Sequence, residues 1–354
     1  MNTQDRNNTC YLVTGVAGNL GSSVAAKLLS EGRRVRGLVL AGDPAASRVP
    51  AAVALYEGDV TNPASLERFF ADTGTDDLVV IHCAAVVTVN SGYSQLVHDV
   101  NVTGTRNIID TCLANQVRKL VYVGSTGAIP DQPKGTPITE IDHFDPEQVV
   151  GYYGQSKAMA AQLVLDAVRE DGLDATLVYP TGFCGPDDYA YGPVASFILD
   201  YCAGNMPMGV AGSFNAVDAR DLADAIVAAC EHGRKGEGYI LGNECVTMRE
   251  MFHLLSEATG TKEVKTILPA WAGTVLGRVS DLTRSLTNKP AKLTSFAIYN
   301  LTRNNDFDSS KARTELGFNT RPFAESITDT IEWLRHEGRL DTVAATTPST
   351  AVAA

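Results

Sequence analysis

A tyrosine and a lysine stand four residues apart in the segment GYYGQSKA, residues 151–158, where they could do acid–base chemistry. On a helix, Tyr153 and Lys157 share one face because they are about one turn apart. A phenol has a pKa of about 10 and carries protons poorly at neutral pH, but a neighbouring ammonium lowers that pKa. The spacing therefore predicts a general acid/base pair, with an exposed pair on a solvated helix as the alternative. Tyr152 has no lysine at this spacing.

Two hydroxyl side chains, Ser125 and Thr126, directly follow the apolar run LVYVG. Open α/β sheets bind their ligands at the carboxyl ends of the strands. A hydroxyl at such a place could polarise a reacting oxygen, which would complete the site. The alternative is a hydroxyl-rich turn that satisfies backbone groups.

The segment TGVAGNLG places three glycines between an apolar run and a helical pattern. A strand, a glycine turn and a helix N-terminus together form an anion site, because the first N–H groups of the helix have no partner within it. Gly15 permits the tight turn, Gly18 lets the backbone approach a pyrophosphate, and Gly21 lets the helix pack closely. Asn19 and Leu20 belong to the same predicted cofactor-binding turn. An ordinary tight turn is the alternative, since the spacing differs from the standard G-x-G-x-x-G.

The ends of the second and third predicted strands would meet the adenosine half of a dinucleotide. An acidic residue after the second strand would bind the ribose of NAD, and a basic one would bind the 2′-phosphate of NADP. Leu40 stands at that place and can do neither, whereas Arg36 can pair with a phosphate. We therefore expect NADP(H), with NAD(H) possible and a solvated Arg36 as the alternative. Asp59 and the Val60 backbone would contact adenine, although Asp59 also suits a simple turn.

A parallel sheet must position these groups. The sequence predicts strands at residues 10–14, 34–40, 52–58, 77–85, 118–125 and 174–180, and helices at 20–32, 63–74, 92–116 and 152–172. Short apolar strands that alternate with helices indicate right-handed β-α-β units and a sheet covered on both faces. The predicted fold class is α/β, a Rossmann-type doubly wound parallel sheet with a smaller, mostly helical C-terminal substrate region.

The pattern loosens after Pro180. We expect residues 1–180 to form the NAD(P)-binding core, residues 181–340 to form a substrate-binding region interleaved with it, and residues 341–354 to be a disordered tail. The apolar stretch at 267–279 is too short to span a bilayer. A buried or pocket-covering helix is favoured there over a membrane-touching or lid helix, with its aromatic residue, Trp271, in a core.

The composition is that of a globular protein, with 44% hydrophobic and 20% charged residues in a chain of 354. The net charge of −12 argues against a nucleic-acid partner. The seven cysteines are odd in number and show no C-x-x-C spacing, so neither a disulfide framework nor a metal site is predicted. Reduced thiols and the absence of a signal-like apolar segment near the start predict a cytoplasmic protein without an integral membrane segment.

Eight motifs in order resemble the extended short-chain dehydrogenase/reductase superfamily, which is also the NAD-dependent epimerase/dehydratase superfamily. They are TGVAGNLG, GDVTNP, VVIHCAA, VNVTGTRNI, LVYVGSTGA, YYGQSK, LVYPTGFCGP and VDARDLADAI. The resemblance covers about residues 10–335 and is strongest to the dihydroflavonol 4-reductase and 3β-hydroxysteroid dehydrogenase-like branch. It implies hydride transfer between NAD(P) and a small-molecule ketone or secondary alcohol of hydrophobic character. It also implies a homodimer formed through the helices at 93–116 and 151–171.

The resemblance implies roles for the catalytic candidates. Tyr153 is then the general acid/base and Lys157 its partner. Thr126 is the catalytic hydroxyl, with Ser125 as the second candidate. Asn101 is structural or near-catalytic.

The resemblance also extends the cofactor site. Ala84 and Ala85 would line the adenosine ribose, and Pro180 and the backbone through Phe183 would face the nicotinamide carboxamide. In reductases of this branch an arginine matching Arg36 meets the 2′-phosphate.

Two other functions remain open within the superfamily. Nucleotide-sugar dehydratases usually carry an Asp-Glu pair after the catalytic hydroxyl, but here Gly127 and Ala128 follow Thr126. This favours alcohol/ketone chemistry over a nucleotide-sugar epimerase or dehydratase. An NAD(P)-sensing binding protein is the third possibility, although such proteins usually lose the tyrosine–lysine pair.

Overall fold

A seven-stranded parallel sheet forms the centre of the protein in the computed structural model, which describes residues 8–74, 77–88, 90–287 and 294–340. The strand order is β10-β6-β5-β4-β1-β2-β3. The strands are β1 (Cys10–Thr14), β2 (Arg34–Val39), β3 (Ala54–Glu57), β4 (Leu78–His82), β5 (Lys119–Val123), β6 (Ala175–Pro180) and β10 (Gly238–Leu241). The chain runs outward from β1 to β3 and then crosses back to β4. The direction of winding therefore reverses between β1 and β4, which confirms the predicted fold class.

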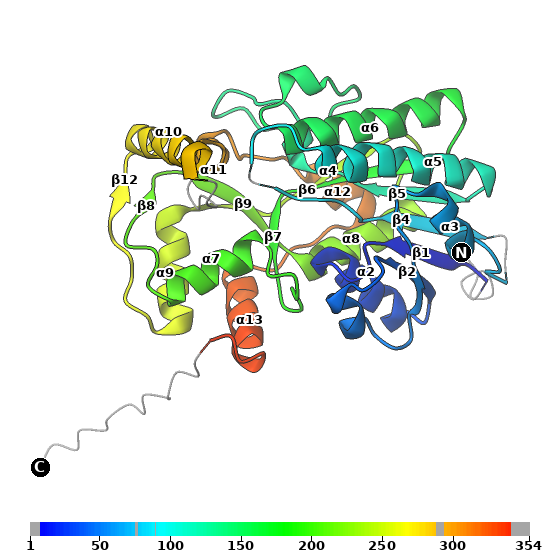
Figure 1. Cartoon of the computed structure of the whole chain (residues 1–354), viewed down its shortest axis with the longest axis horizontal. Helices are drawn as coiled ribbons and strands as arrows, with labels where there is room; N and C mark the ends of the chain where they lie inside the picture. Colours follow the sequence, from blue (N-terminus) through cyan, green and yellow to red (C-terminus); the bar gives the residue numbers. More distant parts are fainter. Residues whose placement is uncertain (1–7, 75–76, 89, 288–293, 341–354) are drawn as a thin grey trace, which may run out of the picture.

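Helices cover both faces of this sheet, as Figure 1 shows for α5 and α6 on one side and α2 and α8 on the other. One layer consists of α3 (Pro63–Phe70), α5 (Gly104–Ala114) and α6 (Tyr152–Glu170), and the other of α2 (Asn19–Ser30), α8 (Ala219–His232) and α12 (Ser310–Leu316). Successive side chains of β1 enter different cores, because Leu12 packs with the first layer and Tyr11 and Val13 with the second. The strands are continuously apolar for this reason.

The C-terminal part of the chain builds a third core in the left half of Figure 1. Its strands are β7 (Gly182–Cys184), β8 (Gly209–Val210), β9 (Ser213–Asp218), β11 (Glu244–Thr247) and β12 (Ile267–Leu268), and its helices are α7 (Pro193–Cys202), α9 (Met248–Thr259), α10 (Ala270–Thr287), α11 (Ser295–Thr302) and α13 (Phe323–His336). The sheet order there is β11-β9-β7, with β8 paired to β12. The α8 helix and β10 return to the large sheet, so the two regions share segments.

Short elements near the strand ends interrupt the predicted pattern. The helix expected at 92–116 consists of α4 (Gln95–His98), a π-helical segment η2 (Asp99–Thr103) and α5. Three 3₁₀ segments are η1 (Pro44–Arg48), η3 (Thr126–Ala128) and η4 (Pro146–Gln148). A π-helical turn often marks a functional site. The predicted tail at 341–354 lies outside the described residues.

Within the described ranges, none of the helices is both long enough and apolar enough to cross a membrane.

Candidate active site

The glycine turn after β1 meets the end of β4 at the carboxyl edge of the sheet, where the winding reverses. Gly15 has a φ of +66°, and a Cβ on it would lie 2.8 Å from the Cα of Ala84. A Cβ on Gly21 would collide with the Gly15 carbonyl, whereas one on Gly18 would have only that carbonyl nearby. Gly15 and Gly21 are therefore required by the fold. Gly18 leaves the approach to the turn open, as a bound pyrophosphate needs.

The N-terminus of α2 offers the charge that such an anion requires. Gly18 is the N-cap of this 12-residue helix, with no side-chain cap and no acidic residue in the first turn. Its first N–H groups and dipole are thus available to a ligand. Asn19 uses its side chain to hydrogen-bond the Asp188 carboxylate, which also accepts from the Gly192 N–H at 2.8 Å. Leu20 is buried in the core beneath. These features fit the pyrophosphate of a dinucleotide.

Tyr153 and Lys157 lie on the first two turns of α6, which packs against the segment after β5. This packing is close because a Cβ on Gly154 would lie 2.5 Å from the Gly127 carbonyl. The Ser125 side chain forms a hydrogen bond with Tyr153 and accepts one from the Gly127 N–H at 3.0 Å.

The two candidate hydroxyls point in different directions. Thr126 donates to the Pro180 carbonyl at 3.2 Å, and its side chain is buried. Ser125 instead forms the bond to the tyrosine. Ser125 is thus the hydroxyl that the fold brings toward Tyr153, whereas Thr126 is turned toward the Pro180 carbonyl.

Burial sets the protonation behaviour of the pair. Desolvation raises the pKa of Tyr153, and the hydrogen bond from Ser125 partly offsets that rise. Desolvation lowers the pKa of Lys157 to about 8. The Lys157 ammonium donates to the Val123 carbonyl at 2.8 Å and lies 5.2 Å from the centre of the Tyr122 ring. Within the described residues it forms no ion pair, so a charged ligand can compensate it.

Two buried polar groups beneath the site fix its backbone. Asn101, in the π-helical segment, accepts from the Val86 N–H at 2.8 Å and donates to the Val86 carbonyl and to Ser156, both at 3.0 Å. Ser156 donates to the Tyr153 carbonyl at 2.7 Å. Asn101 thus joins the loop after β4 to α6 as a structural partner of the catalytic candidates. Ser156 was missed by the sequence analysis, and nothing in its motif distinguishes it from an ordinary helix serine.

His82 forms the second support. Its ring lies 2.7 Å from the Thr14 hydroxyl and 3.1 Å from the Thr105 hydroxyl. Burial, with a smaller contribution from the nearby Lys157 charge, lowers the pKa of His82 to about 3. The ring is thus neutral and ties the end of β1 to that of β4.

Asp59 and Val60 follow the end of β3, whereas Arg36 lies within β2. One Asp59 carboxylate oxygen accepts from the Thr61 N–H at 2.8 Å. The Val60 carbonyl accepts from Asn107 at 2.8 Å. Ala85 is half-buried and follows Ala84 at the end of β4.

Arg36 is buried in the middle of β2, and its guanidinium donates to the carbonyls of Phe69, Ala71 and Asp72 after α3. It also stacks on Tyr56. Both terminal nitrogens of the guanidinium are therefore already hydrogen-bonded, away from the end of the strand. In this structure Arg36 thus ties β2 to the segment after α3, and the structure gives no support to its predicted role at a 2′-phosphate.

The last two predicted contacts lie at the start of the C-terminal region. Pro180 ends β6 and accepts from Thr126, and Phe183 lies in β7 against the core shared with α2 and α8. Across the site, Phe296 of α11 packs so closely on Gly151 that no Cβ fits there. An aromatic side chain therefore borders the start of α6.

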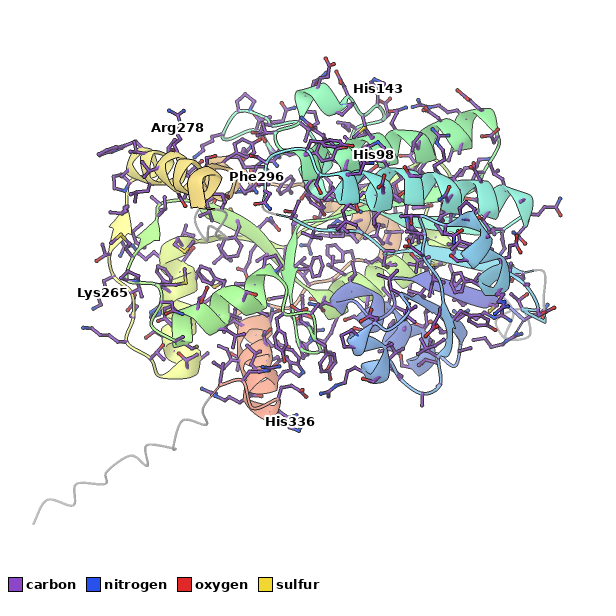
Figure 2. All side chains as sticks on the ribbon, in the orientation of Figure 1. His98, His143, Lys265, Arg278, Phe296 and His336 are labelled. Carbon is purple, nitrogen blue, oxygen red and sulfur yellow. The ribbon has the colours of Figure 1, made fainter. Side chains whose placement is uncertain are left out.

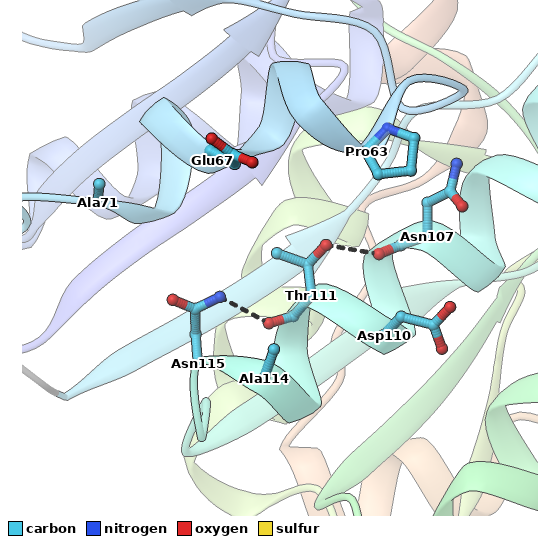
Figure 3. A pocket seen from close by; sticks show the side chains of 8 residues that line it. All are labelled: Pro63, Glu67, Ala71, Asn107, Asp110, Thr111, Ala114 and Asn115. Atoms are coloured by element: carbon cyan, nitrogen blue, oxygen red, sulfur yellow. Dashed lines mark hydrogen bonds between the residues drawn. The ribbon is translucent and has the colours of Figure 1, made fainter.

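A separate hollow of about 400 Å³ lies between α3 and α5 (Figure 3). It is lined by Pro63, Glu67, Ala71, Asn107, Asp110, Thr111, Ala114 and Asn115. None of the candidate cofactor or catalytic residues borders it, and we assign it no role.

A glycine turn at the switch point of a doubly wound sheet, with a half-buried tyrosine and a buried lysine at a neighbouring strand end, defines a Rossmann-fold dehydrogenase-type site. The model of the "NAD dependent epimerase/dehydratase family" matches residues 11–242. The chain belongs to this family, within the extended short-chain dehydrogenase/reductase superfamily. It is an NAD(P)-dependent enzyme that acts on CH–OH and C=O groups.

Full-length relatives support this assignment. The "Sterol demethylase protein B" of Methylococcus capsulatus is 30% identical over 334 residues, which cover 93% of this chain and 99% of the relative. The "Putative dihydroflavonol 4-reductase" of Synechocystis sp. is 26% identical over 337 residues, covering 94% and 96%. The crystal structure of gox2253 superposes with a TM-score of 0.82 at 31% identity, covering 94% of this chain and 100% of that one. The predicted family is thereby confirmed.

Proposed function

We propose that the protein reversibly interconverts an apolar ketone and the corresponding secondary alcohol. The observation that carries the proposal is that the glycine turn, the end of β4 and the acid/base pair of α6 lie together at the carboxyl edge of the sheet. Gly15 contacts Ala84, and the neighbouring Cys83 is close enough to Lys157 to influence its pKa. Lys157 in turn shares a helix face with Tyr153.

In this proposal each residue of the chain has one task. A bound nicotinamide supplies or accepts the hydride. Tyr153 gives a proton to the substrate oxygen, or takes it, through its phenolic oxygen. Ser125 hydrogen-bonds the same oxygen and holds the phenol in place. Lys157 turns from the Val123 carbonyl to ribose hydroxyls and favours the phenolate by its charge.

The cofactor end supports NAD(H) as much as NADP(H). The preference for NADP(H) predicted from Arg36 loses its support because that guanidinium is engaged elsewhere. After β2 the chain offers Leu40, exposed, and Asp43, whose carboxylate caps η1. Neither attracts a phosphate. We therefore propose that NAD(H) binds at least as tightly as NADP(H).

An apolar substrate is supported by the borders of the site. Phe296 packs at the start of α6 and stacks with Tyr299, their ring centres 6.1 Å apart. Tyr299 in turn donates to Asp131 in the segment after β5, so this aromatic wall is anchored to the catalytic side. The relative from Synechocystis bears a reductase name.

We also propose a homodimer in a reducing compartment, the cytoplasm. Tyr93, Leu96 and Val150 are exposed around α4 and the start of α6, as a helix-to-helix interface would require. All seven cysteines are free thiols. Sedimentation of the purified protein tests the dimer, and a Leu96→Asp variant should be monomeric.

The test of the activity follows the hydride itself. Purified protein is incubated with deuterium-labelled NADH or NADPH and a panel of steroid, flavonoid and aliphatic ketones. We expect one deuterium on the carbinol carbon of the product. Stable binding of a nucleotide sugar, with epimerisation and no deuterium taken from added cofactor, would instead show an epimerase. Cofactor binding without turnover of any carbonyl or sugar would favour a sensor.

A further inference from the structure

Between Trp271 and Val279, the part of α10 whose side chains are described, the large apolar side chains face away from the protein. Trp271 is 73% exposed, Val275 55% and Val279 54%. Because these residues follow one another at intervals of four, they form one stripe along the helix. Leu276, 42% exposed, widens it. These four residues are called the α10 stripe below.

The opposite face of α10 attaches the helix to the protein through glycines. A Cβ on Gly273 would collide with Val210, and one on Gly277 would lie 3.0 Å from the backbone of Ser295. Both glycines are buried. In an ordinary surface helix the large apolar residues face the core and polar residues face water. From Trp271 to Val279 the arrangement is the reverse, with the large apolar residues facing outward, so they are available to a partner outside the chain.

Basic side chains accompany the stripe. Lys262 and Lys265 precede β12, and Arg278 lies on α10 between Val275 and Val279. All three are exposed, and none takes part in an ion pair within the described residues. Figure 2 shows Arg278 pointing outward from α10 and Lys265 at the outer edge of the same region. Exposed cations beside an apolar stripe complement an anionic surface.

We propose that α10 docks in the plane of an anionic lipid bilayer. The α10 stripe enters the boundary between headgroups and acyl chains, where tryptophan is favoured, and the three basic residues meet lipid phosphates. A second copy of the chain fits this surface less well, because a symmetric contact would bring the cations of both copies together. A lid is disfavoured because the glycine face already packs on the protein.

Docking would place the bilayer next to the wall of the active site. The α10 helix packs on α11, and Phe296 of α11 contacts Gly151 at the start of α6. An apolar substrate dissolved in the bilayer could therefore reach the site without crossing water. This consequence rests on the proposed function, whereas the docking itself does not.

Tryptophan fluorescence and flotation of the full-length protein test the docking. The chain has two tryptophans, and Trp333 is buried, so a Trp333→Phe variant reports on Trp271 alone. We expect its emission to shift to the blue with phosphatidylcholine vesicles containing phosphatidylglycerol, and less with phosphatidylcholine alone. Flotation with the anionic vesicles should weaken about tenfold in a Trp271→Ser, Val275→Ser variant, and should weaken in high salt.

A matched control is Leu55→Ser, which removes an exposed apolar side chain from β3 and should float as the wild type does. Failure of the wild type to float, or equal loss in the control, overturns the proposal. A concentration-dependent dimer that the α10 variant loses would identify a second copy as the partner instead. None of these readouts measures turnover, so the docking and the proposed activity can fail separately.

Discussion

Helices α6 and α10 have almost the same length, 19 and 18 residues, yet they present opposite faces to the protein. On α6 the side chains that could do chemistry are turned inward, and Ser156 and Lys157 are buried. On α10 the glycines are turned inward and Trp271 outward. The difference follows from position, because α6 covers a sheet that buries whatever faces it, and α10 lies at the edge of a smaller core. A helical pattern predicts burial reliably only where a sheet lies beneath it.

The largest effect should come from the inward face of α6. Tyr153→Phe removes the proposed proton carrier and keeps the ring, so kcat should fall about 10²- to 10⁴-fold. The Kd of NADH, measured by fluorescence, should stay nearly unchanged. Tyr152→Phe is the matched control, since its ring packs on Tyr93 and its hydroxyl has no catalytic task. If kcat fell equally in both variants, Tyr153 would not be the specific proton carrier.

Two glycines, Gly15 and Gly42, test how the surroundings of a residue determine the cost of replacing it. Gly15 and Gly42 have φ values of +66° and +72°, but of the two only Gly15 is so placed that an added methyl group would meet backbone atoms within 4 Å. Gly42→Ala should cost about 1 kcal/mol of unfolding free energy, from conformation alone. Gly15→Ala should cost about 1–3 kcal/mol more, because Ala84 must move. Urea unfolding measures both free energies. Similar values would mean that Ala84 and the turn shift at little cost to accept the methyl group.

The sheet and its glycine turn could be predicted because local rules fix them: alternating periods, apolar runs and a turn that only glycine permits. The pair on α6 was predictable for the same reason, since four residues make one turn. The choice between Ser125 and Thr126 was not, because it depends on where the Pro180 carbonyl lies. The burial of Arg36 and the exposure of Trp271 were not predictable either, since segments far along the chain set the surroundings of each. Sequence predicts which residues share a strand end, and tertiary contacts decide which of them turn toward the ligand.

Charge on the inward face of α6 should make stability depend on pH. Burial lowers the pKa of Lys157 to about 8 from 10.5, so between these values the folded protein binds fewer protons than the unfolded chain. The free energy of unfolding therefore gains a contribution as pH rises from about 8 to about 10.5, by at most about 3 kcal/mol. Tyrosines and cysteines also titrate there, so the measured quantity is wild type minus Lys157→Met. A difference that stays constant across this window would mean that Lys157 is not desolvated.

The smallest effect concerns β2 and the residue that follows it. A buried and an exposed position stand there only four residues apart. Arg36 lies in the strand and is buried, whereas Leu40 lies just beyond its end and is exposed. Arg36→Met should lower stability by about 1–3 kcal/mol, because three carbonyls lose a charged donor, and should leave the ratio of NADPH to NADH affinity unchanged. Leu40→Arg should leave stability unchanged and tighten NADPH about tenfold relative to NADH, since a cation then faces the 2′-phosphate. Titration of both variants with both nucleotides decides the matter. If Arg36→Met weakened the binding of NADPH and not of NADH, Arg36 would be the residue that binds the 2′-phosphate. Position along the strand would then not determine which side chain reaches the cofactor.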